Sequence, residues 1–108
     1  MNATVSDEVR HLSDFLSRAS LDRRINTSHV VLFLGLFQQW TQCRFQNPFG
    51  VDRKEIMAVA KISSRVTYHK CIRELHQWGY IHYEPSYDYY RGSQVYLFYY
   101  RDFKQGRE

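Results

Sequence analysis

The spacing of hydrophobic residues predicts helices over the first three quarters of the chain and strands near its end. Residues 29–43 are apolar on nearly every side, which is typical of a helix buried from several directions. Gly35 in this segment leaves room for a neighbouring element to approach closely. Residues 6–20 are amphipathic, with an apolar stripe of Val9, Leu12, Phe15, Leu16 and Ala19. We therefore expect 29–43 to be the central scaffold, with the amphipathic helix packed on it or on a second chain.

Polar residues that can cap a helix stand before each predicted helix. Asp52, with Glu55 three residues later, has the spacing of a capping box and opens a short helix that ends near Ala60. Before it, residues 49–51 form a short extended piece that could pair with a later hairpin. The candidate caps of the other helices are Ser6 or Asp7, Thr27 or Ser28, and Ser63.

The segment Lys61–Ile81 carries the most informative pattern in the chain. Its apolar residues lie at helical spacing and form one stripe, made up of Tyr68, Cys71, Ile72, Leu75 and Trp78. Gly79 stands where a helix commonly ends in the left-handed conformation. The opposite face is polar and basic, with Arg65, Thr67, His69, Lys70 and Arg73. Because Lys61 and Ile62 leave room only for a tight turn after the short helix, the two helices predict a helix-turn-helix.

After Gly79 the pattern changes to a period of two, which indicates strands. In residues 80–84 and 95–100, alternate side chains point to opposite sides, and residues 85–94 between them contain turn formers. The expected fold is α+β and mainly helical. Residues 1–26 form an N-terminal helix and its connection, and residues 27–108 form a helix-turn-helix domain with a C-terminal β-hairpin.

The positive charge of the chain is concentrated on the second helix of this motif. The net charge is +4 at pH 7 and the isoelectric point is about 9.2, which alone are weak indications of a nucleic-acid partner. Residues 61–73, however, contain four basic residues and no acidic one. Lys70 is followed four residues later by Glu74, and we expect these two to form a compensating pair. The face as a whole stays positive, which favours contact with DNA.

The stretch from residue 54 to residue 81 resembles the DNA-binding half of the bacterial MarR-like and GntR-like regulators, which are winged helix-turn-helix proteins. The similarity lies in a serine-capped second helix that is followed by LHQWGYI at 75–81 and then by a hairpin. The resemblance as a whole covers about residues 27–100 and is sharpest over 54–81. Stand-alone domains of this size also serve as accessory factors of plasmids and transposons. The effector domain of GntR-like proteins and the long C-terminal helix of MarR-like proteins have no counterpart in it. The resemblance implies that Arg73 reaches a phosphate, that Arg91 serves the wing, and that Ser64, Arg65, Thr67, His69 and Lys70 enter the major groove.

The chemistry of these side chains agrees with a DNA partner. Arg65 is best suited to read a base, since its two-pronged guanidinium matches the O6 and N7 acceptors of guanine. Free N–H groups at Ser63 and Ser64 can bind a phosphate. In the hairpin tip, we expect Arg91 in or beside the minor groove and Ser93 on a phosphate. The sequence therefore predicts a sequence-specific, double-stranded DNA-binding protein, either a bacterial transcriptional regulator or a mobile-element accessory factor.

Catalytic and metal-binding functions find little support in the residues. The five histidines include no pair four residues apart, and there is no Cys-x-x-Cys, so we expect neither a metal site nor another cofactor. A phosphate-binding glycine loop and a nucleophile motif are also missing from the sequence. We therefore do not expect an enzyme.

The remaining expectations concern location and partners. Since no apolar run is long enough to cross a membrane and the first residues lack the build of a signal peptide, we expect a cytoplasmic protein. Cys43 and Cys71 are then expected to be buried thiols, although two cysteines also allow one disulfide. The stripe of residues 6–20 suggests a homodimer through Val9, Leu12, Phe15 and Leu16. The alternative to DNA binding is a winged helix that serves as a protein-interaction module in a larger assembly.

Overall fold

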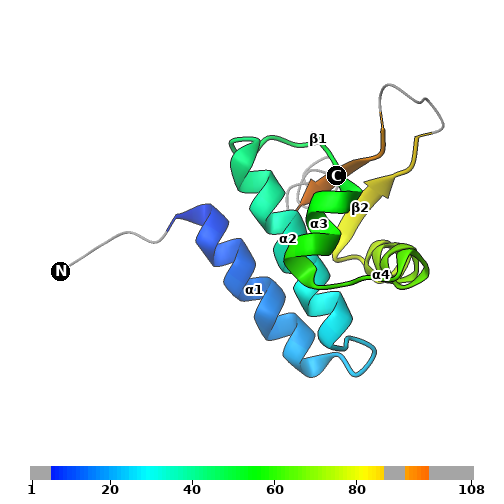
Figure 1. The fold of residues 1–108 in the computed structure, drawn as a ribbon. Helices are drawn as coiled ribbons and strands as arrows, with labels where there is room; N and C mark the ends of the chain where they lie inside the picture. Colours follow the sequence, from blue (N-terminus) through cyan, green and yellow to red (C-terminus); the bar gives the residue numbers. More distant parts are fainter. Residues whose placement is uncertain (1–5, 87–91, 98–108) are drawn as a thin grey trace.

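Four helices and a small antiparallel sheet make up the described part of the chain, residues 6–86 and 92–97 (Figure 1). This computed structural model is α+β and mainly helical, as the hydrophobic pattern predicts. The helices are α1 (Asp7–Leu21), α2 (Thr27–Gln42), α3 (Arg53–Ala60) and α4 (Arg65–Gln77). The strands are β1 (Phe49–Gly50), β2 (Ile81–Glu84) and β3 (Gln94–Leu97). Within these ranges no helix has the length and apolar character needed to cross a membrane.

The first three helices begin at polar caps, two of them at the predicted residue. Ser6 caps α1 and Asp52 caps α3, each accepting a hydrogen bond from the backbone N–H three residues later. Helix α2 is capped by Asn26, so the prediction of Thr27 or Ser28 is wrong. The side chain of Asn26 already accepts the N–H of Ser28 at 2.9 Å, which makes Thr27 the first helical residue.

The cap of α4 is Ser64, one residue later than the predicted Ser63. Its Oγ accepts the backbone N–H of Thr67 at 3.2 Å. The shift arises in the turn, where Lys61 takes the left-handed conformation (φ 61°) and Ile62 is buried in the core. After the buried Ile62, the chain therefore passes through Ser63 and Ser64 before α4 begins at Arg65.

Helix α2 lies at the centre of the core, as its apolar sequence predicts. Its fully buried residues include Leu32, Phe33, Leu36 and Trp40. Helix α3 packs against α2 at Gly35, where an added Cβ would lie 3.1 Å from Ile56 Cγ2. The close approach expected at this glycine is confirmed, because an added Cβ would contact Ile56 so tightly that the Ile56 side chain would have to shift.

Helix α1 lies along α2 (Figure 1), and its apolar stripe is divided between the core and the surface. Phe15 is only 3% exposed, and its ring stacks on Phe33 with 3.6 Å between the ring centroids. Leu12 packs partly against the same core, whereas Val9 and Leu16 are exposed. The prediction that Phe15 belongs to a dimer surface is therefore wrong, because this ring is already used inside the chain.

The sheet has the order β1-β3-β2, and both pairs of strands are antiparallel. The register places Phe49 opposite Val95 and Ile81 opposite Leu97. The extended piece predicted at residues 49–51 thus pairs with the hairpin, as expected. Val95 and Leu97 face the core, in agreement with the predicted alternation. β3 begins at residue 94, and the last three residues of the strand predicted at 95–100 lie outside the described residues.

One carboxylate ties the connection after α1 to the segment after α4. Asp22 accepts a hydrogen bond from the Tyr80 hydroxyl at 2.7 Å and two from the Arg24 guanidinium at 2.8 and 2.9 Å. These bonds, those from Arg24 first, hold the pKa of Asp22 well below its usual range. Arg18 lies over the Tyr80 ring, 4.5 Å from its centroid. Tyr80 directly follows Gly79, and this glycine takes the left-handed conformation (φ 83°) predicted for the end of the helix.

The two cysteines are free thiols in different surroundings. Cys71 in α4 is buried, as predicted. Cys43 is exposed, so the prediction of a buried thiol is wrong at this position. The reason is that Cys43 caps the end of α2, beyond Trp40, the last fully buried residue of that helix.

Candidate nucleic-acid interface

The buried side chain of Gln39 in α2 positions helix α3. Its Nε2 donates to the backbone oxygen of Asp52 and to the carboxylate of Glu55, each at 3.1 Å, and its Oε1 accepts the N–H of Asp52 at 3.1 Å. These bonds hold the beginning of α3 against α2. The next helix, α4, buries the predicted residues Tyr68, Cys71, Ile72 and Leu75. Both α3 and α4 are therefore anchored to the rest of the fold.

The side of α4 away from the core presents a line of exposed residues at helical spacing. They are Val66, Lys70, Arg73 and Gln77. Arg65 is exposed at the start of the helix, whereas Thr67 and His69 are half-buried at the edges of this face. The structure thus places the predicted basic residues of α4 on one side of that helix. It adds Val66, an apolar residue outside the buried stripe that a pattern of charge alone does not single out.

The expected pair between Lys70 and Glu74 does not form, and its absence makes the face more positive. Glu74 turns toward α2, where its carboxylate lies 2.8 Å from His29 Nε2. In the described part of the chain, Lys70 has no ion-pair partner, and neither has Arg65 or Arg73. The prediction fails because a buried imidazole N–H needs its hydrogen bond, while an exposed ammonium is well solvated without one.

Three guanidinium groups act on the ionisation of His69. Its pKa is lowered, first by partial burial and then by the positive charges of Arg53, Arg65 and Arg73. Arg65 and Arg73 are predicted contact residues, but Arg53 belongs to α3 and extends the basic surface to that helix. The available signal in the sequence is the basic pair Arg53-Lys54, which the capping pattern at this position obscures.

A groove between α3 and the beginning of α4 is bordered by basic side chains. Its lining includes Arg53, Lys54, Lys61 and Arg65, and no residue that lines it is acidic. Ser63, which is exposed, adds a hydroxyl group. Since cations and a hydroxyl are the groups that contact phosphate oxygens in protein–DNA complexes, the groove is suited to a phosphate backbone.

The other predicted site residues have different surroundings. Ser63 and Ser64 are exposed at the beginning of α4, although the hydroxyl of Ser64 is used in capping. Ser93 is half-buried, and its hydroxyl accepts hydrogen bonds from the Tyr83 hydroxyl at 3.3 Å and from a backbone N–H at 3.4 Å. The hydrogen bonds of this hydroxyl therefore lie within the hairpin. Arg91 lies outside the described residues.

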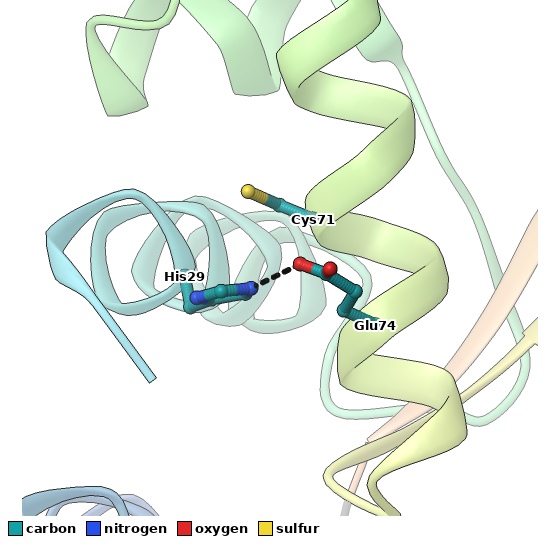
Figure 2. A group of neighbouring side chains, drawn as sticks. All are labelled: His29, Cys71 and Glu74. Atoms are coloured by element: carbon teal, nitrogen blue, oxygen red, sulfur yellow. Dashed lines mark hydrogen bonds and ion pairs between the residues drawn. The ribbon is translucent and has the colours of Figure 1, made fainter. Parts of the chain in front are cut away.

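Behind the basic face, His29, Cys71 and Glu74 bring three kinds of metal-ligand atom together, and these atoms lie within 4.8 Å of one another. Figure 2 shows His29 pointing from α2 toward Glu74 of α4, with the Cys71 sulfur beside them. His29 is only 2% exposed. Spacing along the sequence does not reveal this cluster, because two separate helices contribute to it.

The hydrogen bonds assign this cluster a structural role. Nδ1 of His29 accepts the backbone N–H of Asn26 at 3.1 Å, so Nε2 carries the ring proton and donates it to Glu74. A metal ion on Nε2 would move that proton to Nδ1, where it would face the Asn26 N–H. Burial, together with the charge of Glu74, also raises the pKa of Cys71, which disfavours the thiolate that a metal requires. The geometry favours a link between α2 and α4 over a metal site.

Comparison with known proteins provides no relative from which a function could be transferred. No protein-family model, curated protein or solved structure matches the chain. The geometry and charge of the interface are therefore the grounds for assigning a function.

Proposed function

We propose that this chain is a winged helix-turn-helix protein that binds double-stranded DNA with α4 in the major groove. The observation that carries the proposal is the outward face of α4, where Arg65, Lys70 and Arg73 are exposed and have no ion-pair partner among the described residues. A duplex suits this face because its major groove admits an α-helix and its phosphates attract basic side chains. The resemblance to MarR-like and GntR-like regulators makes transcriptional regulation, or an accessory role in a mobile element, the proposed setting.

The order and pairing of the elements support the winged-helix interpretation. Helix α2 is followed by β1, α3, α4 and the hairpin β2–β3, and β3 pairs with both other strands. Residues 61–64 form the turn between α3 and α4, and the left-handed Lys61 reverses the chain there. In this interpretation α4 is the recognition helix and the hairpin is the wing.

Each basic residue has a role that follows from its place. Arg65 begins α4, and we expect its guanidinium to read a guanine edge, worth about 1–3 kcal/mol of discrimination against other bases. Arg53, Lys54 and Lys61 line the groove beside α4 and are expected to hold the phosphate backbone. Arg73 lies farther along α4 and is expected to reach a second stretch of backbone. Together with the remaining basic side chains of the α3–α4 surface, these residues would neutralise about four to seven phosphates.

We also propose a homodimer through α1. Val9 and Leu16 lie seven residues apart on one side of this helix, and their side chains are 53% and 44% exposed. Leu16 also lines a groove between α1 and α2, together with Ile25 and Val30. A second copy would cover this apolar surface and present two recognition helices to one duplex. The same surface is the observation that favours the alternative function, a protein-interaction module.

The double variant Arg65→Ala with Lys70→Ala tests the assignment of α4 as the recognition helix. We expect it to weaken duplex binding at least about tenfold, because a base contact and a second cationic contact are lost. The log–log salt slope is expected to become shallower by at least about 1, since each phosphate contact contributes about that much. Fluorescence anisotropy with a labelled duplex measures both quantities.

The matched control is Arg10→Ala with Arg23→Ala, which removes two exposed guanidinium groups outside the helix-turn-helix. Its net charge changes equally, but neither residue belongs to α3 or α4 or lines the basic groove, so we expect a smaller effect. Equal losses in the two double variants would show that binding follows net charge and would contradict the assignment.

A further inference from the structure

Val66 is an apolar residue in the middle of the basic face of α4. Its side chain is 78% exposed, directly after Arg65 and four residues before Lys70. The buried stripe of α4 lies on the opposite side of the helix, so Val66 adds nothing to the core. Helix formation does not favour it either, since β-branched residues have a lower helix propensity than leucine, lysine or arginine. The fold therefore gives no reason for a valine at this position.

The major groove of DNA contains one group that an exposed aliphatic side chain fits. Only thymine carries a methyl group at C5, while the other base edges in the groove present hydrogen-bond donors and acceptors. Contact between this methyl and the γ-methyls of Val66 would remove apolar surface from water on both molecules. In helix-turn-helix proteins, the first residues of the recognition helix contact the base edges, and Val66 is the second residue of α4.

We propose that Val66 reads the 5-methyl group of a thymine. This inference rests on the proposed function, because it requires α4 to lie in the major groove. Arg65 precedes Val66 in the same turn of the helix, so the thymine is expected within about one or two base pairs of the guanine that Arg65 contacts. Val66 is thus a specificity-determining residue beside a cationic one.

The test uses the full chain and duplexes that differ by single methyl groups. A bound sequence is selected from a randomised duplex pool, and each thymine in it is then replaced, one at a time, by deoxyuridine, which lacks only the 5-methyl. For the wild-type chain, one or two of these replacements are expected to weaken binding about threefold to fivefold. For Val66→Ser, the same replacements are expected to have no effect, because the γ-methyls are already gone.

Val59→Ser is the matched control, because Val59 is an exposed valine of α3 that does not line the basic groove. It is expected to respond to deoxyuridine as the wild type does. Two results would overturn the inference and leave the proposed function standing. In the first, the duplex is bound but no deoxyuridine replacement weakens the binding of the wild type. In the second, the replacements weaken the binding of Val66→Ser as strongly as that of the wild type. Failure to bind any duplex, even at low salt, would overturn the proposed function and the inference together.

Discussion

At the scale of single residues, His69 connects the charge of the interface to pH. Its pKa is lowered in the free protein, first by partial burial and then by Arg53, Arg65 and Arg73. The negative phosphates of a bound duplex would offset the charge of these guanidinium groups, so the pKa of His69 is expected to rise when DNA binds. A group with a higher pKa in the complex than in the free protein takes up a proton on binding, and it therefore favours the complex at low pH.

We predict that lowering the pH from about 8 to about 6 strengthens duplex binding about threefold to tenfold. His69→Gln, which cannot ionise, is expected to remove this gain, whereas His11→Gln in α1 is expected to retain it. Anisotropy titrations of the three proteins at both pH values provide the comparison. A pH effect in His69→Gln as large as that of the wild type would rule out this role.

Predictions for individual residues succeed where a neighbour in sequence decides the outcome. Asp52 caps its helix and Gly79 takes the left-handed conformation, because both depend on residues a few positions away. Lys70 and Glu74 also have the right spacing for a pair, but His29, far away in the sequence, takes the carboxylate instead. Local rules cannot foresee such a competitor.

At the scale of elements, the link between α2 and α4 holds the proposed recognition helix in place. His29 belongs to the capping box that begins α2, and its other ring nitrogen donates to Glu74 of α4. One imidazole thus joins the first turn of α2 to the second half of α4. Loss of its acceptor would leave a buried N–H without a partner.

Glu74→Ala is predicted to lower the free energy of unfolding by about 1–3 kcal/mol. Glu74→Gln retains an acceptor oxygen for His29 and is predicted to cost less than about 1 kcal/mol. Urea denaturation of the two variants and the wild type measures both values. If the glutamine and alanine variants lose the same free energy, the hydrogen bond to His29 does not hold α4 as described.

The elements themselves are largely predictable, but their contacts are not. A continuous apolar sequence indicates a central helix at 29–43, and a period of two indicates the hairpin strands. The stripe of α1 gives no sign that Phe15 stacks inward on Phe33 while Leu16 stays exposed. Both residues satisfy the same periodicity, and only the packing of the other helix separates them.

At the scale of the whole molecule, two surfaces with different chemistry lie on different elements. The basic surface is formed by α3 and α4, and the exposed apolar residues Val9 and Leu16 belong to α1. In Figure 1, α1 and α4 lie on different sides of α2. The arrangement suits a protein that binds a duplex on one side and a second copy on another. Charge counting predicts the first surface, but Arg53 and Lys54 join it only through the folded position of α3.

We predict that the chain in solution has twice its mass of 13.1 kDa. The double variant Val9→Ser with Leu16→Ser is expected to be monomeric, because it places two hydroxyl groups in the proposed apolar contact. Sedimentation equilibrium over a range of concentrations determines both masses. Phe15 should not be changed in this test, since its ring belongs to the core. A monomeric wild type, or an unaltered dimer in the variant, would show that α1 does not form a dimer contact.

If the α3–α4 surface binds a DNA backbone, the affinity for a duplex must fall as the salt concentration rises. Anisotropy titrations of a mixed-sequence duplex of about 30 base pairs, at several salt concentrations, give the affinity and its log–log slope. We predict binding in the micromolar range with a slope between about −4 and −7, which matches the phosphate contacts proposed for the basic side chains. Absence of binding even at the lowest salt concentration would show that this surface does not bind DNA.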